Sequence, residues 1–495
     1  MINVQYEKGY IPALDGVRGA AILLVILFHC LEDSIYPISI LSKIGWVGVD
    51  LFFVLSGFLI TGILIDTKGK KNFILTFFFK RILRIFPLYY LSLLIFFTVI
   101  LIPNITSTNY YLNIGHFDNI FYFLTYTQNI LFSFKGWGIT DILNHFWSLA
   151  IEEQFYLFWP LVVMFFSNKR IIFISFLLIF TSLIVRNFNI DNPFSYVFTL
   201  SRMDALSIGS ISAILIRKNI YHINKYIHYI FVISLSTLFF IVLITHSLKI
   251  TNIHFIRYGY TVFDILFASL IILTFDTKKI GKITCWIFNI KFLRFLGKYS
   301  YGIYVYHWLL YRGLYASFES YYSLPKVFIL PFLALVLLIS MLSYHYYEMF
   351  FLKYKNRINE NTNFKELLSF KNIKTGIKNA LRNIRIFFLN FKETINNIPF
   401  IRKAIDKEKL AKDRQVLNES LAKANQDAKY WADINKKRAK DGNFFESTLN
   451  RLKQKEQQRI DRELVESNKI KSDANIEGLE AEEEANRDLN KLKEN

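Results

Sequence analysis

The sequence predicts an all-α membrane protein with about ten transmembrane helices and a C-terminal cytoplasmic helical tail. Hydrophobic residues make up 53% of the 495 residues, and 50 of them are Phe, which exceeds the usual share in a soluble domain. Apolar runs long enough to cross a bilayer recur between residues 19 and 350 and then stop. We therefore expect a transmembrane domain at 1–351, a basic amphipathic juxtamembrane segment at 352–401 and a charged tail at 402–495.

The ten expected spans follow from these apolar runs. They lie near residues 20–38, 45–65, 84–103, 145–166, 171–187, 197–216, 227–248, 258–275, 299–315 and 326–349. The loops on one side hold most of the basic residues, and the positive-inside rule places those loops and both termini in the cytoplasm. The apolar stretch 118–134 must then stay outside as an interfacial or re-entrant helix, because one more span would invert every later loop.

The first apolar run carries Arg18 and His29, with ten residues between them. On a helix these residues stand roughly 16 Å apart along the axis. Ionisable groups inside a membrane usually have a function, and histidine takes and returns a proton near neutral pH. The spacing indicates an anion-binding group at one membrane face and a general base deep in the span. The alternative is an arginine that snorkels to the interface and a histidine bonded to a neighbouring helix.

Arg81 and Arg84 lie three residues apart at the cytoplasmic end of the third expected span. They share one helix face and can bind a polyphosphate through charge-assisted hydrogen bonds. The alternative is that they only anchor the helix on the positive-inside side. The net charge of +20 suits anionic lipid or phosphate-bearing ligands, but not nucleic acid, because the basic residues lie between spans.

The fourth expected span begins with the sequence HFWSLAIEEQFYLFWP. His145, Ser148, Glu152 and Tyr156 recur on one helix face, with Glu153 beside them. Carboxylates at membrane depth should point into a cavity, where they can orient a histidine or bind a hydroxyl-rich ligand. An ion pair with an arginine is the structural alternative.

Other spans carry polar residues at similar depth. These are Asp50 and Ser56 in the second span, Arg202 and Asp204 in the sixth, and Ser300, Tyr304 and His307 in the ninth. We assign Asp50, His145 and His307 to substrate binding. A nucleophilic Ser56 is possible but has no partnered base in the sequence. The chain has no metal-ligand spacing, phosphate-binding glycine loop or dinucleotide fingerprint, so we expect no metal.

Six segments together resemble the acyltransferase 3 family of integral-membrane acyltransferases. They are LDGVRGAAILLVILFH, VGVDLFFVLSGFLITG, FKRILRIFPLYY, HFWSLAIEEQFYLFWP, SRMDALSIGS and LGKYSYGIYVYHW, and they cover about residues 10–350 in the right order. The resemblance implies transfer of an acyl group, usually acetyl from cytoplasmic acetyl-CoA, to a carbohydrate hydroxyl outside or at the outer leaflet. It also implies that Arg18, Arg81 and Arg84 contact the coenzyme A phosphates and that His29 is the catalytic base. Glu348 lacks the proline that often follows it in the family.

The sequence therefore favours a multi-pass O-acyltransferase of the cell membrane, with acyl-CoA and a carbohydrate as its substrates. Glu152 or Glu153 would orient His29 or hold the sugar, and a covalent acyl-histidine intermediate stays open. A secondary transporter would also carry charges within its spans, but it should show inverted repeats. A membrane scaffold acting through the tail would need no buried His or Glu.

The tail has its own pattern. Residues 370–391 place apolar and basic side chains on different faces, which is typical of a helix lying on an anionic membrane leaflet. Beyond residue 402, Leu410, Leu417, Ala424 and Trp431 repeat every seven residues. This short seam indicates a coiled coil or helical hairpin that self-associates or binds a partner protein; a solvated helix is the alternative.

Overall fold

The computed structural model describes residues 11–31, 42–100, 119–137, 141–190, 193–218, 221–276, 279–317 and 326–359, together with Thr362, separate positions between 415 and 429, and residues 453–462. The chain divides into two compact units, residues 1–387 and 388–495. Within the described residues every regular element is a helix. This confirms the predicted all-α class.

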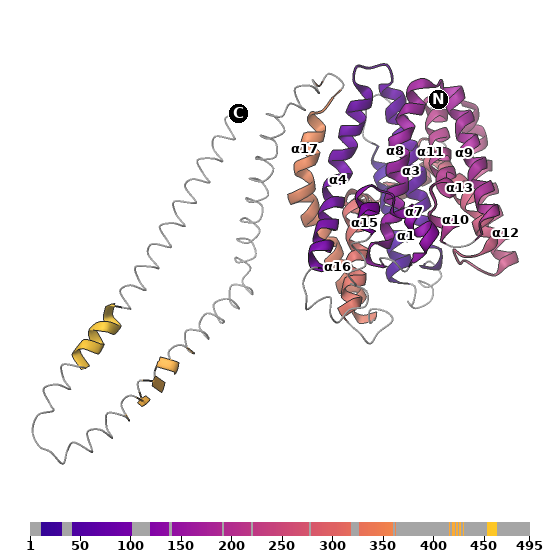
Figure 1. The fold of residues 1–495 in the computed structure, drawn as a ribbon. Coiled ribbons are helices and arrows are strands. Elements are labelled where there is room, and N and C mark those ends of the chain that lie inside the picture. The colour runs from indigo at the N-terminus through magenta and orange to yellow at the C-terminus, as the bar shows by residue number, and fades with distance from the viewer. Residues whose placement is uncertain are drawn as a thin grey trace, which may run out of the picture. The chain divides into compact units, whose positions relative to one another are not determined.

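The first unit is a bundle of long helices joined by shorter ones (Figure 1). The α-helices are α1 (Pro12–Cys30), α3 (Val47–Thr67), α4 (Phe73–Ile100), α6 (Ile120–Leu124), α7 (Gln128–Lys135), α8 (Trp147–Phe165), α9 (Asn168–Phe188), α10 (Phe194–Val197), α11 (Thr199–Arg217), α12 (Tyr221–Thr245), α13 (Tyr260–Leu273), α14 (Lys279–Phe288), α15 (Lys291–Ser317), α16 (Lys326–Leu342) and α17 (Met349–Arg357). A 3-10 helix, η4 (Asp141–Phe146), precedes α8, and two π-helical turns, η5 (Phe255–Gly259) and η6 (Ser343–Glu348), precede α13 and α17.

Eight stretches of the described helices are long and apolar enough to cross a membrane. They are Pro12–Cys30, Val47–Thr67, Phe73–Thr98, Asn168–Phe188, Phe194–Arg217, Tyr226–Thr245, Phe255–Leu273 and Phe328–Arg357. The other two predicted spans correspond to α8 and α15, which have 19 and 27 residues. Both are long enough to cross a membrane, but their polar side chains lower their mean hydropathy, so they are not among the eight apolar stretches. A multi-pass membrane protein is thus supported, while the count of ten stays a prediction.

The first helix begins earlier than the sequence predicted. It covers Pro12–Cys30 instead of 20–38, because Pro12 is well suited to the first turn of a helix and Asp15 and Arg18 continue the same helix. His29 therefore lies in the last turn of α1 and not deep in the span.

Backbones touch where glycines meet in two helix pairs. A side-chain carbon added at Gly297 of α15 would lie 1.8 Å from the carbonyl oxygen of Asp15 in α1, and one added at Gly19 would lie 1.9 Å from that of Leu293. Gly57 and Gly209 bring α3 and α11 together in the same way. Small residues allow such close crossings in membrane bundles. These crossings fix the positions of the helices that carry the candidate site.

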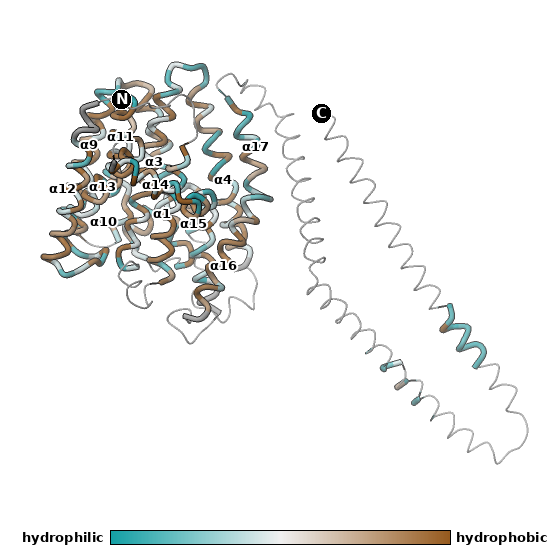
Figure 2. Tube along the Cα trace, turned by 180° about the vertical axis from the view of Figure 1, so that it is seen from behind, coloured by the Kyte–Doolittle hydropathy of each residue, from teal (hydrophilic) through white to brown (hydrophobic). Residues whose placement is uncertain are grey.

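The outward faces of α9 and α12 are apolar. Phe173, Phe176 and Phe180 on α9 and Phe239 and Phe240 on α12 are all more than half exposed, and Figure 2 draws much of both helices in the brown of apolar residues. In contrast, α3, α11 and α13 are mostly buried. The bundle therefore has an apolar exterior suited to lipid.

The stretch 118–134 contains two short helices in place of a span. α6 has five residues and α7 has eight, so neither can cross a bilayer. The chain turns between them at Tyr126, whose φ is +54°. This agrees with the prediction of a segment that does not span.

In the second unit, residues 453–462 form a helix whose side chains are exposed. The predicted amphipathic segment 370–391 and all the named seam residues lie outside the described residues.

Candidate active site

Two neighbouring cavities bring together most of the predicted site residues. The first, which we call the arginine cavity, has a volume of about 110 Å³. It is lined by residues of five helices, including Arg18, Arg81, Arg84, Ser56, Glu152 and Tyr304. The three arginines that the family resemblance assigned to coenzyme A thus line one cavity from α1 and α4.

The arginines differ in their local partners. Arg18 forms an ion pair with Asp15, one helical turn earlier, at 2.6 Å. Arg81 lies over the rings of Phe77 and Tyr156 at 5.8 and 5.6 Å. Among the described residues, neither Arg81 nor Arg84 is ion-paired with a carboxylate within 4.0 Å. Their charge is therefore available to an anionic ligand.

Glu152 lies in the wall of the arginine cavity. Its two carboxylate oxygens accept hydrogen bonds of 2.8 Å from Ser56 and Tyr156. Glu153 lines neither of the two cavities, and one of its oxygens is buried without a hydrogen-bond partner among the described residues. In this conformation Glu152 orients two hydroxyl groups. Its predicted bond to His29 is not among its contacts.

The second cavity, which we call the histidine cavity, has a volume of about 330 Å³. Its wall contains His29 and His145, the polar residues Asp141 and Asn144, and the aromatic residues Trp46, Trp137, Trp147, Tyr196 and Trp308. This volume falls within the usual range of small-ligand pockets. Aromatic rings beside a few polar groups suit a hydroxyl-rich ligand that has apolar faces.

Of the described residues, Val49 and Tyr304 alone line both cavities. The Tyr304 hydroxyl donates to the carbonyl oxygen of His145 at 2.5 Å and lies 2.5 Å from the hydroxyl of Ser148. Ser148 faces the arginine cavity and His145 the histidine cavity. Tyr304 is therefore held at the boundary between them.

His29 contacts a second predicted site residue, His307. The two side chains meet through His29 Nδ1 and His307 Nε2, 2.9 Å apart, and the ring centroids of His29 and Trp308 are 4.6 Å apart. His307 is fully buried and lines neither cavity. Its predicted contact with substrate therefore has no support from its position.

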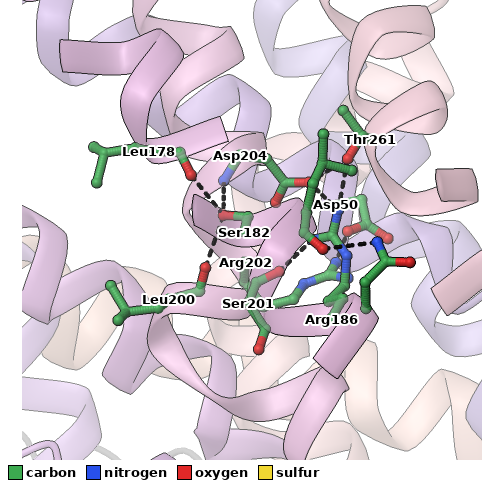
Figure 3. Close-up of polar contacts among 11 residues, drawn as sticks. Asp50, Leu178, Ser182, Arg186, Leu200, Ser201, Arg202, Asp204 and Thr261 are labelled. Carbon is green, nitrogen blue, oxygen red and sulfur yellow. Dashed lines mark hydrogen bonds and ion pairs between the residues drawn. The ribbon is translucent and has the colours of Figure 1, made fainter. Parts of the chain in front are cut away.

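Asp50 is not among the residues that line either cavity. It is fully buried and forms an ion pair with Arg202 of α11. Beside this pair, Arg186 donates to Asp204 at 2.7 Å and to Thr261 at 2.6 Å (Figure 3). The structure thus places Asp50 in a buried charge network, and its predicted contact with substrate has no support from its position.

Several wall residues were missed by the sequence reasoning. Asp141 forms an ion pair with Arg312, and its backbone carbonyl accepts a 2.8 Å hydrogen bond from Trp308. Trp308 directly follows His307 in the sequence, so the polar residues of the ninth span could have pointed to Trp308 as a wall residue. Asp141 lies in a short connection without any pattern that would have marked it.

An arginine-lined cavity that adjoins a histidine-lined one inside a bundle of apolar helices places groups for an anionic ligand beside a histidine, an arrangement that suits a membrane-bound transferase. The chain belongs to the acyltransferase 3 family, whose acyltransferase domain matches residues 11–345. It is 29% identical over 370 residues to O-acetyltransferase OatA of Staphylococcus aureus (strain NCTC 8325 / PS 47), which covers 70% of this chain and 58% of that protein. It is 36% identical over 163 residues to peptidoglycan O-acetyltransferase OatA of Listeria monocytogenes, covering 32% and 25%. The chain thus spans less than two thirds of these relatives, and no solved structure matches it significantly.

Proposed function

We propose that this protein transfers an acetyl group from cytoplasmic acetyl-CoA to a hydroxyl of a cell-surface or lipid-linked carbohydrate. The observation that carries the proposal is the adjacency of the arginine cavity and the histidine cavity, which share the wall at Val49 and Tyr304. Membership of the family and the O-acetyltransferase names of the relatives support the same chemistry. The protein would reside in the cell membrane with both termini in the cytoplasm.

The donor would bind at the arginine cavity. Arg18, Arg81 and Arg84 would hold the phosphates of coenzyme A through charge-assisted hydrogen bonds. The basic loops on this side, including Lys68, favour a cytoplasmic orientation. The thioester would then reach the boundary at Tyr304, where the arginine cavity meets the histidine cavity.

The acceptor would enter the histidine cavity, where its sugar rings could stack on the tryptophans. His29 removes the proton from the acceptor hydroxyl, and the oxygen attacks the thioester carbonyl carbon. The carbon–sulfur bond breaks, and the protonated imidazole returns its proton to the coenzyme A sulfur. The products are an ester and a free thiol, and no net proton is consumed.

The test compares His29→Ala with His254→Ala, a control at an exposed histidine that lines neither cavity. Purified protein is placed in liposomes. Isotopically labelled acetyl-CoA is added on the side of the membrane that corresponds to the cytoplasm, and glycan fragments are added on the opposite side. Mass spectrometry then reports acetylated glycan. We expect acetylation by wild type and His254→Ala, and a loss of at least about 100-fold in His29→Ala. Equal acetylation by His29→Ala would end the general-base assignment, and no transfer by wild type would end the proposed function.

A further inference from the structure

The two ring nitrogens of His307 have different partners. Nδ1 lies 2.7 Å from the carbonyl oxygen of Tyr304 and 3.1 Å from that of Ile303. A carbonyl oxygen can only accept a hydrogen bond, so Nδ1 carries the proton. In the neutral ring, Nε2 is then an acceptor, and it faces Nδ1 of His29 at 2.9 Å.

This arrangement determines which nitrogen of His29 holds a proton. His29 must donate from Nδ1 to His307, which leaves the lone pair on His29 Nε2. We infer that His307 is a positioning residue that holds His29 in the tautomer whose Nε2 acts as the base. The inference rests on the proposed function and adds to it the atom that takes the proton.

The surroundings of the pair support this role. His29 is partly exposed and lines the histidine cavity, whereas His307 is fully buried behind it. The two rings are nearly parallel, with an interplanar angle of 18°. The partner of His29 is thus held by the backbone of α15, and it plays the orienting part that a carboxylate plays in a Ser-His-Asp triad.

The other titratable groups around the pair have partners of their own. The Nε2 atom of His145 lies 3.2 Å from the carbonyl oxygen of Val305, Asp141 is paired with Arg312, and the Tyr304 hydroxyl donates to a backbone carbonyl. His29 Nδ1 therefore faces a neutral acceptor. A carboxylate placed there would add a negative charge beside the ring.

A matched pair of variants, His307→Gln and His307→Leu, tests the positioning role. The Gln side-chain oxygen can accept from His29 Nδ1, while Leu fills similar space without an acceptor. We expect Gln to retain most of the turnover, and Leu to lower kcat by about 100-fold with the KM for acetyl-CoA unchanged. Equal losses in both variants, or a loss confined to KM, would overturn the inference. Thermal unfolding identifies variants that fail to fold.

A second measurement does not depend on activity. Diethyl pyrocarbonate modifies only unprotonated imidazole. Peptide mass spectrometry can measure its rate of reaction with His29 at a series of pH values. The dependence of this rate on pH reports the pH at which His29 loses its proton. In His307→Glu the added charge stabilises the protonated ring, and the midpoint of this reaction should move to higher pH than in wild type or His307→Gln. An unchanged midpoint in a folded Glu variant would show that His307 does not act on His29. A failure of the proposed function would give a different result, because the wild-type protein would then not acetylate glycan.

Discussion

Two buried ion pairs in this bundle join different helices. Asp50 pairs with Arg202, and Arg186 with Asp204, and the side chains in both pairs are fully buried. A charge without a partner is expensive at membrane depth, and breaking a buried pair typically costs several kcal/mol. These pairs therefore require α3, α9 and α11 to lie together. Arg81 and Arg84 differ because, among the described residues, neither has a carboxylate partner within 4.0 Å.

The absence of such a partner at Arg84 leads to a binding prediction. Arg84→Ala should weaken coenzyme A binding by about 10- to 100-fold, which corresponds to one lost charge-assisted hydrogen bond of about 1.5–3 kcal/mol. The difference from wild type should shrink at raised salt, because screening weakens the Arg84–phosphate attraction that the variant has already lost. Arg84→Lys should restore binding only partly, since the planar donor fork is lost. Thermal stabilisation of the purified protein by coenzyme A measures the affinity.

Arg170→Ala is the matched control, because Arg170 is an exposed arginine on α9 and lines neither cavity. It should leave the stabilisation by coenzyme A unchanged. If Arg84→Ala behaved like Arg170→Ala, Arg84 would serve only to orient α4 in the membrane.

Sequence reasoning at the residue scale found the ionisable groups but not their partners. Arg18, Arg81 and Arg84 were predicted to bind one ligand, and the fold does bring them to one cavity. The contact of His29 with His307 and that of Asp50 with Arg202 join helices far apart in the chain. Hydrophobic periodicity reports which residues leave water, and it does not tell which helices meet.

At the scale of the element, apolar length predicted the helices better than their ends. The runs near 45–65 and 171–187 correspond closely to α3 and α9. The first span was placed eight residues too late, because hydropathy gave too little weight to the stretch that contains Asp15 and Arg18. The π-helical turns η5 and η6 have no signature in single-residue hydropathy. Close crossings were likewise invisible, since a glycine in a helix has no periodic signal.

The crossing of α1 and α15 gives a prediction at this scale. Gly297→Ala should lower the free energy of unfolding by about 1–3 kcal/mol, because the new methyl group would meet the backbone of α1 and not a movable side chain. It should also lower activity, since the same two helices carry His29 and His307. Thermal unfolding in detergent and glycan acetylation measure the two effects.

The control lies on the same helix. An added carbon at Gly313 meets no atom of the described part of the chain within 4 Å, so Gly313→Ala should be neutral or stabilise by up to about 1 kcal/mol, the ordinary gain of Ala over Gly in a helix. Equal destabilisation by both substitutions would show that helix propensity, and not the crossing, decides the outcome.

At the scale of the whole molecule, the candidate site lies within the first unit. The residues that line the two cavities fall between Arg18 and Trp308, and the family match ends at residue 345. The proposed transfer would bring donor and acceptor together at the wall that Val49 and Tyr304 share. All the described residues that line the two cavities belong to the first unit, residues 1–387.

The tail should therefore be dispensable for the chemistry. A chain shortened to residue 400 should keep coenzyme A binding and glycan acetylation close to those of the full chain, because every cavity residue is retained. The predicted seam at Leu410, Leu417 and Trp431 is too short to be a stable isolated helix, so it should depend on self-association or on a partner protein. Light scattering and cross-linking in membranes should then show a smaller assembly for the shortened chain. If the shortened chain inserts normally but loses turnover, the tail is part of the catalytic unit. If the two chains form assemblies of equal size, the seam does not mediate association.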